Sequence, residues 1–185
     1  MMNAAVTDKF EQFEWLTKGI TAKSPNFEPN VRGTGEQPLN YEDRLGAIAA
    51  METQLEKSVT AVIIFGEKSE IDYRLVQSHL AAILKTNAML DGRREPEKIK
   101  ISELADLVAR MVMDFSLNPE LEANFTKQGR LYYAGIRSWQ MTLRAYDGTW
   151  KQYETLMVIA LESAIDSAAK AIEKYRKKTL SDAKK

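Results

Sequence analysis

The residues best suited to binding chemistry lie between positions 127 and 151. This stretch holds five basic residues and one acidic residue, Asp147, so its net charge is +4. Basic side chains can neutralise DNA phosphates. The letters A-G-I-R-S at 134–138 predict a tight turn between two short helices, as in the helix-turn-helix module, whose second helix reaches base edges. We therefore expect phosphate contacts from Lys127, Arg130, Arg137, Arg144 and Lys151, with Gln140 and Thr142 on the second helix as base readers.

A second interpretation of the same stretch has equal support from the sequence. The segment would then be a pair of surface helices whose aromatic side chains belong to the hydrophobic core. The basic residues would be an ordinary solvated face. The aromatic residues that decide between the two interpretations are Tyr132, Tyr133, Trp139, Tyr146 and Trp150.

Nothing in the sequence predicts catalysis. His79 is the single histidine and has no second ligand or nucleophile near it in the sequence, so we expect a plain surface or core residue. Glu103 and Asp106 have a helical spacing, but without histidine neighbours a solvated face is the better interpretation. The chain has no cysteine, which excludes disulfides, thiol catalysis and thiolate metal sites. We expect a protein that is not an enzyme and has no catalytic residue, cofactor or metal.

The pattern of apolar residues predicts an all-α fold, a compact bundle of six to eight helices with the helix-turn-helix-like segment near 127–147. One strong helix is expected to begin at Asn40 and end at Gly66. Asn118 followed by Pro119 predicts the start of a short helix. Asp147-Gly148 predicts a turn, after which Thr149 is expected to cap a long C-terminal helix.

Proline and glycine divide the chain near its N-terminus. Residues 21–39 are polar and contain three prolines and two glycines, so they predict a linker or long loop. We expect an N-terminal helix and flexible arm over 1–40, and a helical domain over 41–185 that includes the basic segment 127–151.

Composition places the chain among ordinary soluble proteins. Hydrophobic residues make up 44% and charged residues 28%, with a formal net charge of zero. Apolar runs are all shorter than the ~20 residues of a membrane span. Asp8, Glu11 and Glu14 near the start argue against a signal peptide. We expect a cytoplasmic protein without a membrane partner.

The order of several segments resembles a known family. They are L-G-A-I-A-A-M-E-T-Q-L (45–55), I-F-G-E-K-S-E-I-D (64–72), I-S-E-L-A-D-L-V-A-R-M-V-M-D-F (101–115) and T-W-K-Q-Y-E-T-L-M (149–157). In this order the chain resembles the late-gene antitermination proteins, called Q, of lambda-like bacteriophages. Members similar to the lambda protein carry a cysteine-rich zinc module, which this cysteine-free chain lacks.

The resemblance implies a factor that binds DNA and bacterial RNA polymerase in the cytoplasm of the host cell and promotes read-through of terminators. An alternative from the same basic segment is a helical DNA-binding regulator or packaging subunit. Another is a phage protein that binds no DNA and inhibits a host protein. The sequence does not determine the oligomeric state.

Overall fold

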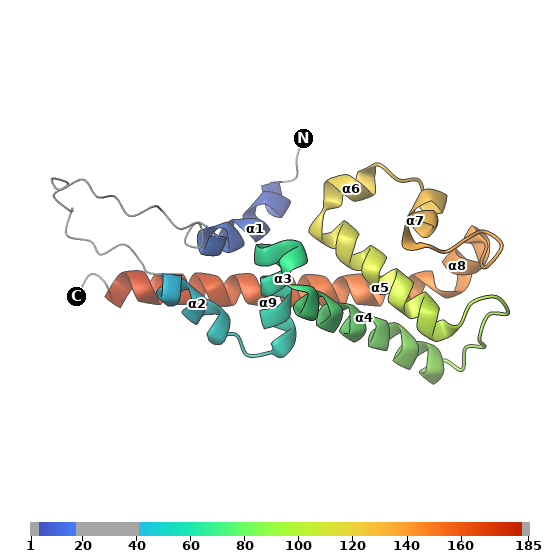
Figure 1. The fold of residues 1–185 in the computed structure, drawn as a ribbon, viewed down its shortest axis with the longest axis horizontal. Helices are drawn as coiled ribbons and strands as arrows, with labels where there is room; N and C mark the ends of the chain where they lie inside the picture. Colours follow the sequence, from blue (N-terminus) through green and yellow to red (C-terminus); the bar gives the residue numbers. More distant parts are fainter. Residues whose placement is uncertain (1–3, 18–40, 183–185) are drawn as a thin grey trace. The chain divides into compact units, whose positions relative to one another are not determined.

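The computed structural model describes residues 4–17 and 41–182, and over these residues the regular structure is entirely helical. The all-α prediction is confirmed. The described residues form nine α-helices and one 3-10 helix (Figure 1). Their bounds are α1 Ala4–Thr17, α2 Tyr41–Ala49, α3 Gln54–Phe65, the 3-10 helix Gly66–Lys68, α4 Glu70–Leu90, α5 Ile101–Leu117, α6 Pro119–Ala123, α7 Lys127–Ala134, α8 Leu143–Thr149 and α9 Lys151–Asp182.

The chain divides into two compact units. Unit 1 consists of residues 1–69 and 165–185, and unit 2 consists of residues 70–164. The long C-terminal helix predicted from the sequence is α9, and both units include part of it. The predicted linker 21–39 and the domain boundary expected after residue 40 lie outside the described residues. The described part of the expected helical domain begins at residue 41.

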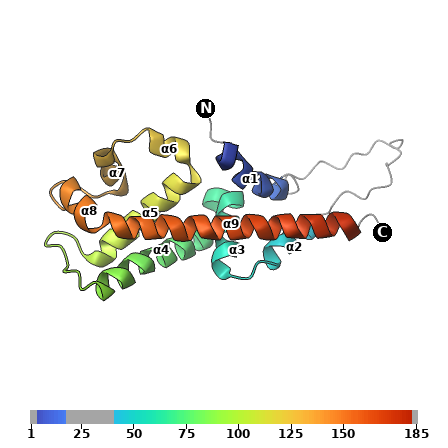
Figure 2. The same ribbon diagram turned by 180° about the vertical axis from the view of Figure 1, so that it is seen from behind.

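Unit 2 is built on α4 and α5, which lie side by side in both views (Figures 1 and 2). Leu80 and Leu84 of α4 and Leu104 and Val108 of α5 are fully buried, and each pair is spaced by one helical turn. Burial of each such side chain contributes about 1.5–3 kcal/mol. α6 and α7 also pack on α5.

Unit 1 brings α1 and α2 against α3. Phe13 and Leu16 of α1 are buried. The intervening Trp15 faces two arginines, with the Arg44 guanidinium 5.2 Å and the Arg176 guanidinium 5.9 Å from its ring. Arg44 Nη1 also donates a hydrogen bond to the Trp15 carbonyl oxygen at 2.6 Å.

The single helix expected from Asn40 to Gly66 is wrong, because the structure has two helices there. A capping box formed by Thr53 and Glu56 starts a new helix within the expected range. Thr53 Oγ1 accepts a hydrogen bond from the Glu56 amide at 3.1 Å, and Glu56 Oε2 accepts one from the Thr53 amide at 3.1 Å. This box satisfies the free amides of a new helix start, so α3 begins at Gln54. The described residues therefore hold more helices than the six to eight expected.

Two expectations about the start of the long helix are also wrong. Asp147 and Gly148 do not form a turn but lie within α8, and Thr149 is the last residue of α8 rather than the cap of α9. Tyr146 and Trp150 are buried, and the Trp150 amide donates to the Tyr146 carbonyl oxygen at 2.8 Å. Burial of these two aromatic rings holds the backbone helical where the local sequence favours a turn.

Candidate nucleic-acid interface

The tight turn predicted at A-G-I-R-S ends α7. Gly135 has a φ of 97°, in the left-handed region that favours glycine. The Gly135 amide donates to the Tyr132 carbonyl oxygen at 3.0 Å, and the Ile136 amide donates to the Leu131 carbonyl oxygen at 2.9 Å. These bonds form a Schellman motif, which satisfies the last carbonyls of α7 and turns the chain.

The second helix begins later than expected. Residues 135–142 connect α7 to α8, and α8 starts at Leu143. Gln140 and Thr142, predicted to read bases from the second helix, therefore lie before it. Gln140 Oε1 accepts from the Arg137 amide at 3.0 Å, and Thr142 Oγ1 accepts from the Ala145 amide at 3.3 Å as the N-cap of α8. The Gln140 oxygen thus stabilises the backbone of the connection, and the Thr142 oxygen stabilises the first turn of α8.

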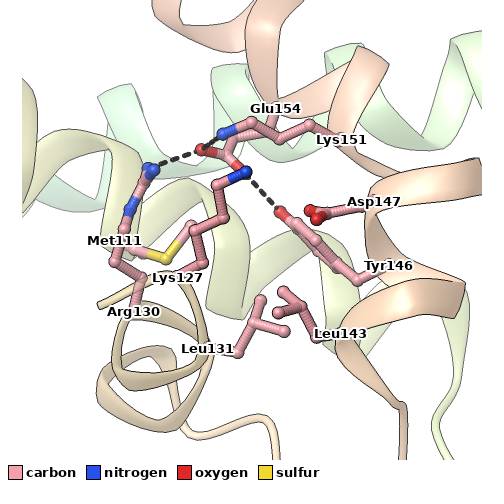
Figure 3. A pocket seen from close by; sticks show the side chains of 9 residues that line it. All are labelled: Met111, Lys127, Arg130, Leu131, Leu143, Tyr146, Asp147, Lys151 and Glu154. Atoms are coloured by element: carbon pink, nitrogen blue, oxygen red, sulfur yellow. Dashed lines mark hydrogen bonds and ion pairs between the residues drawn. The ribbon is translucent and has the colours of Figure 1, made fainter. Parts of the chain in front are cut away.

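Two of the five predicted phosphate ligands converge on a buried carboxylate (Figure 3). Glu154 of α9 is only 2% exposed. Its Oε1 lies 2.6 Å from Arg130 Nη2 and 2.6 Å from Lys151 Nζ, and its Oε2 accepts from the Tyr146 hydroxyl at 2.7 Å. Arg130 also pairs with Glu122 at 3.1 Å. These contacts supply the partners that a carboxylate needs when it leaves water.

The Glu154 network changes the electrostatics of the basic segment. Two carboxylates, Glu154 and Glu122, compensate the charges of Arg130 and Lys151 within the protein, so the +4 counted along the sequence overstates the charge available to a ligand. Burial, followed by the nearby Glu154 carboxylate, raises the pKa of the Tyr146 hydroxyl far above its ordinary value of 10.0. Tyr146 therefore stays protonated and acts as a hydrogen-bond donor to Glu154.

Lys127 and Arg144 remain exposed. Lys127 lines a pocket of about 210 Å³ together with Arg130, Tyr146 and Glu154 (Figure 3). Arg144, in the first turn of α8, makes no ion pair with the residues that the structure describes. These two side chains are accessible to an anionic ligand.

The remaining predicted phosphate ligand, Arg137, stacks on an aromatic ring. Its guanidinium lies 4.0 Å from the centre of the Tyr132 ring, and Tyr132 is nevertheless 66% exposed. Trp139, two residues further along the connection, is 64% exposed. We call Tyr132, Arg137 and Trp139 the aromatic patch. The sequence alone does not indicate that Tyr132 and Trp139 lie on the surface.

Of the other three aromatic residues of the segment, two are buried, as the second interpretation expected, and Tyr133 is half-buried. Tyr146 and Trp150 are buried, and Tyr133 stacks on Phe115 with ring centres 5.1 Å apart. The Tyr133 hydroxyl donates to Asp114 at 2.9 Å, and burial followed by this hydrogen bond raises its pKa. Tyr146 and Trp150 therefore lie in the core, whereas Tyr132 and Trp139 lie on the surface.

Other features of the described residues offer no chemistry. His79 is an exposed residue of α4. Over residues 4–17 and 41–182, no three histidine or acidic side chains are grouped as a metal site requires. None of the helices in these ranges is long and apolar enough to cross a membrane.

Comparison with protein families, with characterised proteins and with solved structures gave no match to this chain.

Proposed function

We propose that this protein binds nucleic acid, and that the aromatic patch holds the bases of an unpaired strand. The observation that carries the proposal is the exposure of Tyr132 and Trp139, at 66% and 64%, together with the stacking of the Arg137 guanidinium on the Tyr132 ring. Large aromatic rings are costly to leave in water. Bases stack on such rings whatever their identity, and arginine planes extend the stacking surface.

A single strand fits these residues better than the major groove of a duplex. A recognition helix needs free side chains on its exposed first turns. Here α8 has seven residues, and the side-chain oxygens of Gln140 and Thr142 already accept hydrogen bonds from the Arg137 and Ala145 amides. Lys127 and Arg144, both exposed, would neutralise phosphates of the bound strand.

Trp139→Ala is expected to weaken binding of a fluorescently labelled oligo(dT) strand by about 10- to 100-fold, because each stacked base contributes about 1–3 kcal/mol. Anisotropy titrations at two salt concentrations measure this. The affinity of the parent chain should fall with added salt, and a duplex of the same length should bind more weakly.

Leu156→Ala is the matched control, since Leu156 is another exposed large side chain of unit 2, at 41%, but has no aromatic ring. It should bind like the parent, and neither variant should melt at a lower temperature. If the Trp139 variant binds the strand as tightly as the control, stacking on the patch is excluded.

A protein partner is the second candidate for the same patch. Tryptophan, tyrosine and arginine are the residues most enriched at the centres of protein interfaces. The Glu154 network favours it, because Arg130 and Lys151 are paired with Glu154 and Glu122 and the segment therefore has fewer cations for phosphate than its sequence suggests. Absence of any salt-dependent oligonucleotide binding would select this candidate.

The particular role that we propose is transcription antitermination, which rests on the sequence resemblance. Such a factor acts in the cytoplasm of the bacterial host cell on DNA and RNA polymerase. We expect the parent chain to co-purify with bacterial RNA polymerase and to increase run-off transcription across a terminator. The Trp139→Ala variant should lose read-through. Equal transcript lengths with and without the parent chain would exclude this role while leaving strand binding intact.

A further inference from the structure

Three lysines of α9 form a row on one side of the helix, in the part that belongs to unit 1. Lys170, Lys174 and Lys178 are spaced by four residues, so they follow one another about 6 Å apart along the helix axis. All three are exposed, and none makes an ion pair with the residues that the structure describes. We call these residues the lysine row. Its charge is available to a partner.

The helix dipole does not account for the lysine row. Cations are favoured in the last turn of a helix, where they offset its negative end. The last turn of α9 contains no basic residue, and the lysine row lies before it. Over residues 166–178, five basic residues outnumber two acidic residues, Asp166 and Glu173. Glu173 is paired with Lys177, which lies outside the row. This part of α9 therefore keeps an excess of positive charge.

The lysine row borders a groove of about 490 Å³. A second row of α9 side chains, also spaced by four residues, runs beside it in the groove and consists of Ser167, Ala171 and Tyr175. Gly46 of α2 lets the Tyr175 ring come close, because a side chain at this glycine would collide with the Tyr175 hydroxyl. The groove is thus already formed in the free protein, which lowers the cost of binding.

The wall opposite the lysine row is acidic. It contains Glu52 from the connection between α2 and α3, and Glu56 from α3. Glu56 Oε2 accepts hydrogen bonds from the Glu52 and Thr53 amides, each at 3.1 Å. Glu52 is exposed, and neither carboxylate forms an ion pair with a lysine of the row. A phosphate chain, negative along its whole length, would be repelled by this wall.

We propose that the groove binds an acidic α-helix of a partner protein, whose carboxylates lie in one row and face the lysine row. Side chains four residues apart on a helix lie about 6 Å from one another, so successive carboxylates meet successive lysines. In the commonest class of helix packing, such a row of one helix fits between two rows of the other. Ser167 and Ala171 are small enough for the two axes to approach to about 8 Å.

The acidic wall makes the groove selective. Glu52 disfavours a partner with negative charge on all sides, so the acidic residues of the bound helix must be confined to one row. This proposal does not rest on nucleic-acid binding. The groove and the aromatic patch share no residue, and they belong to different units.

The first test uses a fluorescein-labelled peptide of about 20 alanine and glutamine residues, long enough to form a helix in water, with three glutamates spaced by four. An isomer of the same composition has its glutamates distributed around the helix. We expect the full chain to bind the first peptide at low ionic strength and to lose affinity as salt is added. The isomer should bind at least several-fold more weakly. Fluorescence anisotropy measures both affinities.

The second test removes the charges of the lysine row. Lys174→Gln should weaken peptide binding by about 2- to 5-fold, and replacing all three lysines with glutamine should weaken it by about 10-fold or more. Lys177→Gln is the matched control, because it removes the same charge from an exposed position of the same helix outside the groove. It should bind the peptide like the parent. Unchanged far-UV circular dichroism and melting temperature show that the variants are folded.

The third test exchanges the charges of one pair. A peptide with lysine in place of its central glutamate should bind Lys174→Glu more tightly than it binds the parent, if carboxylates and lysines meet one to one.

Equal binding of the first peptide and its isomer overturns the proposal, because the partner's charge need not then lie in one row. So does a triple glutamine variant that binds the peptide like the parent, since the contact must lie elsewhere. If the triple variant loses affinity for oligo(dT) while its affinity for the peptide is unchanged, the lysine row contacts nucleic acid and not an acidic helix.

Discussion

Replacing Arg130 with methionine is expected to lower the free energy of unfolding by about 3 kcal/mol, because it removes one partner of a buried ion pair. Glu154, 2% exposed, would keep only Lys151 and the Tyr146 hydroxyl as partners. Arg130 Nη2 is also the group that links Glu154 to Glu122. Urea denaturation followed by circular dichroism measures the loss.

Lys151→Met is the matched control for this prediction. Its ammonium lies at the same 2.6 Å from Glu154 Oε1, but the Lys151 side chain is 41% exposed, against 21% for Arg130. A partly exposed pair is screened by water, so the control should cost about 1 kcal/mol or less. Equal losses for the two variants would show that the lower exposure of Arg130 does not make its ion pair with Glu154 more stabilising than that of Lys151.

A double-mutant cycle separates the free energy of the Arg130–Glu154 ion pair from the contribution that the two side chains make by packing. Adding Glu154→Leu to Arg130→Met removes the buried charge that the first change leaves uncompensated. The double variant should therefore be more stable than Arg130→Met alone, by about 1–2 kcal/mol. A double variant less stable than Arg130→Met would mean that Glu154 stabilises unit 2 through Lys151 and Tyr146 rather than through Arg130.

The Glu154 network could not be predicted from the sequence, for a physical reason. Glu154 follows the buried Tyr153 at the edge of the apolar stripe of α9, where an acidic residue is usually solvated. Its main partner, Arg130, is 24 residues away and comes from another helix. Charge counted along a segment cannot reveal a compensating group that tertiary packing supplies.

Features that depend only on residues close in the sequence were predicted more successfully than the Glu154 network. Asn118 caps α6 as expected, with its side chain accepting from the Leu121 amide and Pro119 in the first turn. The glycine turn after α7 was likewise correct in position. Both rest on bonds between residues only a few positions apart, so the local sequence contains all the partners.

The predictions were wrong where a local sequence signal competed with the apolar pattern around it or with tertiary burial. The letters T-Q-L-E at 53–56 form a capping box, but they lie within a long apolar pattern that favours one continuous helix. Asp147-Gly148 is a turn signal that tertiary burial of Tyr146 and Trp150 overrides. For the candidate site, the consequence is that Gln140 and Thr142 were assigned to a helix that begins only at Leu143.

Phe13→Ala is expected to destabilise unit 1 by about 3–5 kcal/mol, the usual cost of removing a buried phenylalanine side chain. Phe13 is 2% exposed, and α1 packs against α3. Trp15, two residues away, lies within 6 Å of two arginines and is the natural reporter of this packing. Its fluorescence during urea unfolding measures the change, recorded with Trp139 and Trp150 replaced by phenylalanine in both proteins.

Glu11→Ala is the matched control in α1, since Glu11 is exposed on the same helix and should change stability by less than about 0.5 kcal/mol. The comparison also bears on which partner α1 could engage. Because Phe13 and Leu16 face the interior of unit 1, a partner of α1 would meet the exposed side of this helix, which carries Glu11. A Phe13 variant as stable as the control would mean that α1 does not pack in solution and that its apolar face is free to bind.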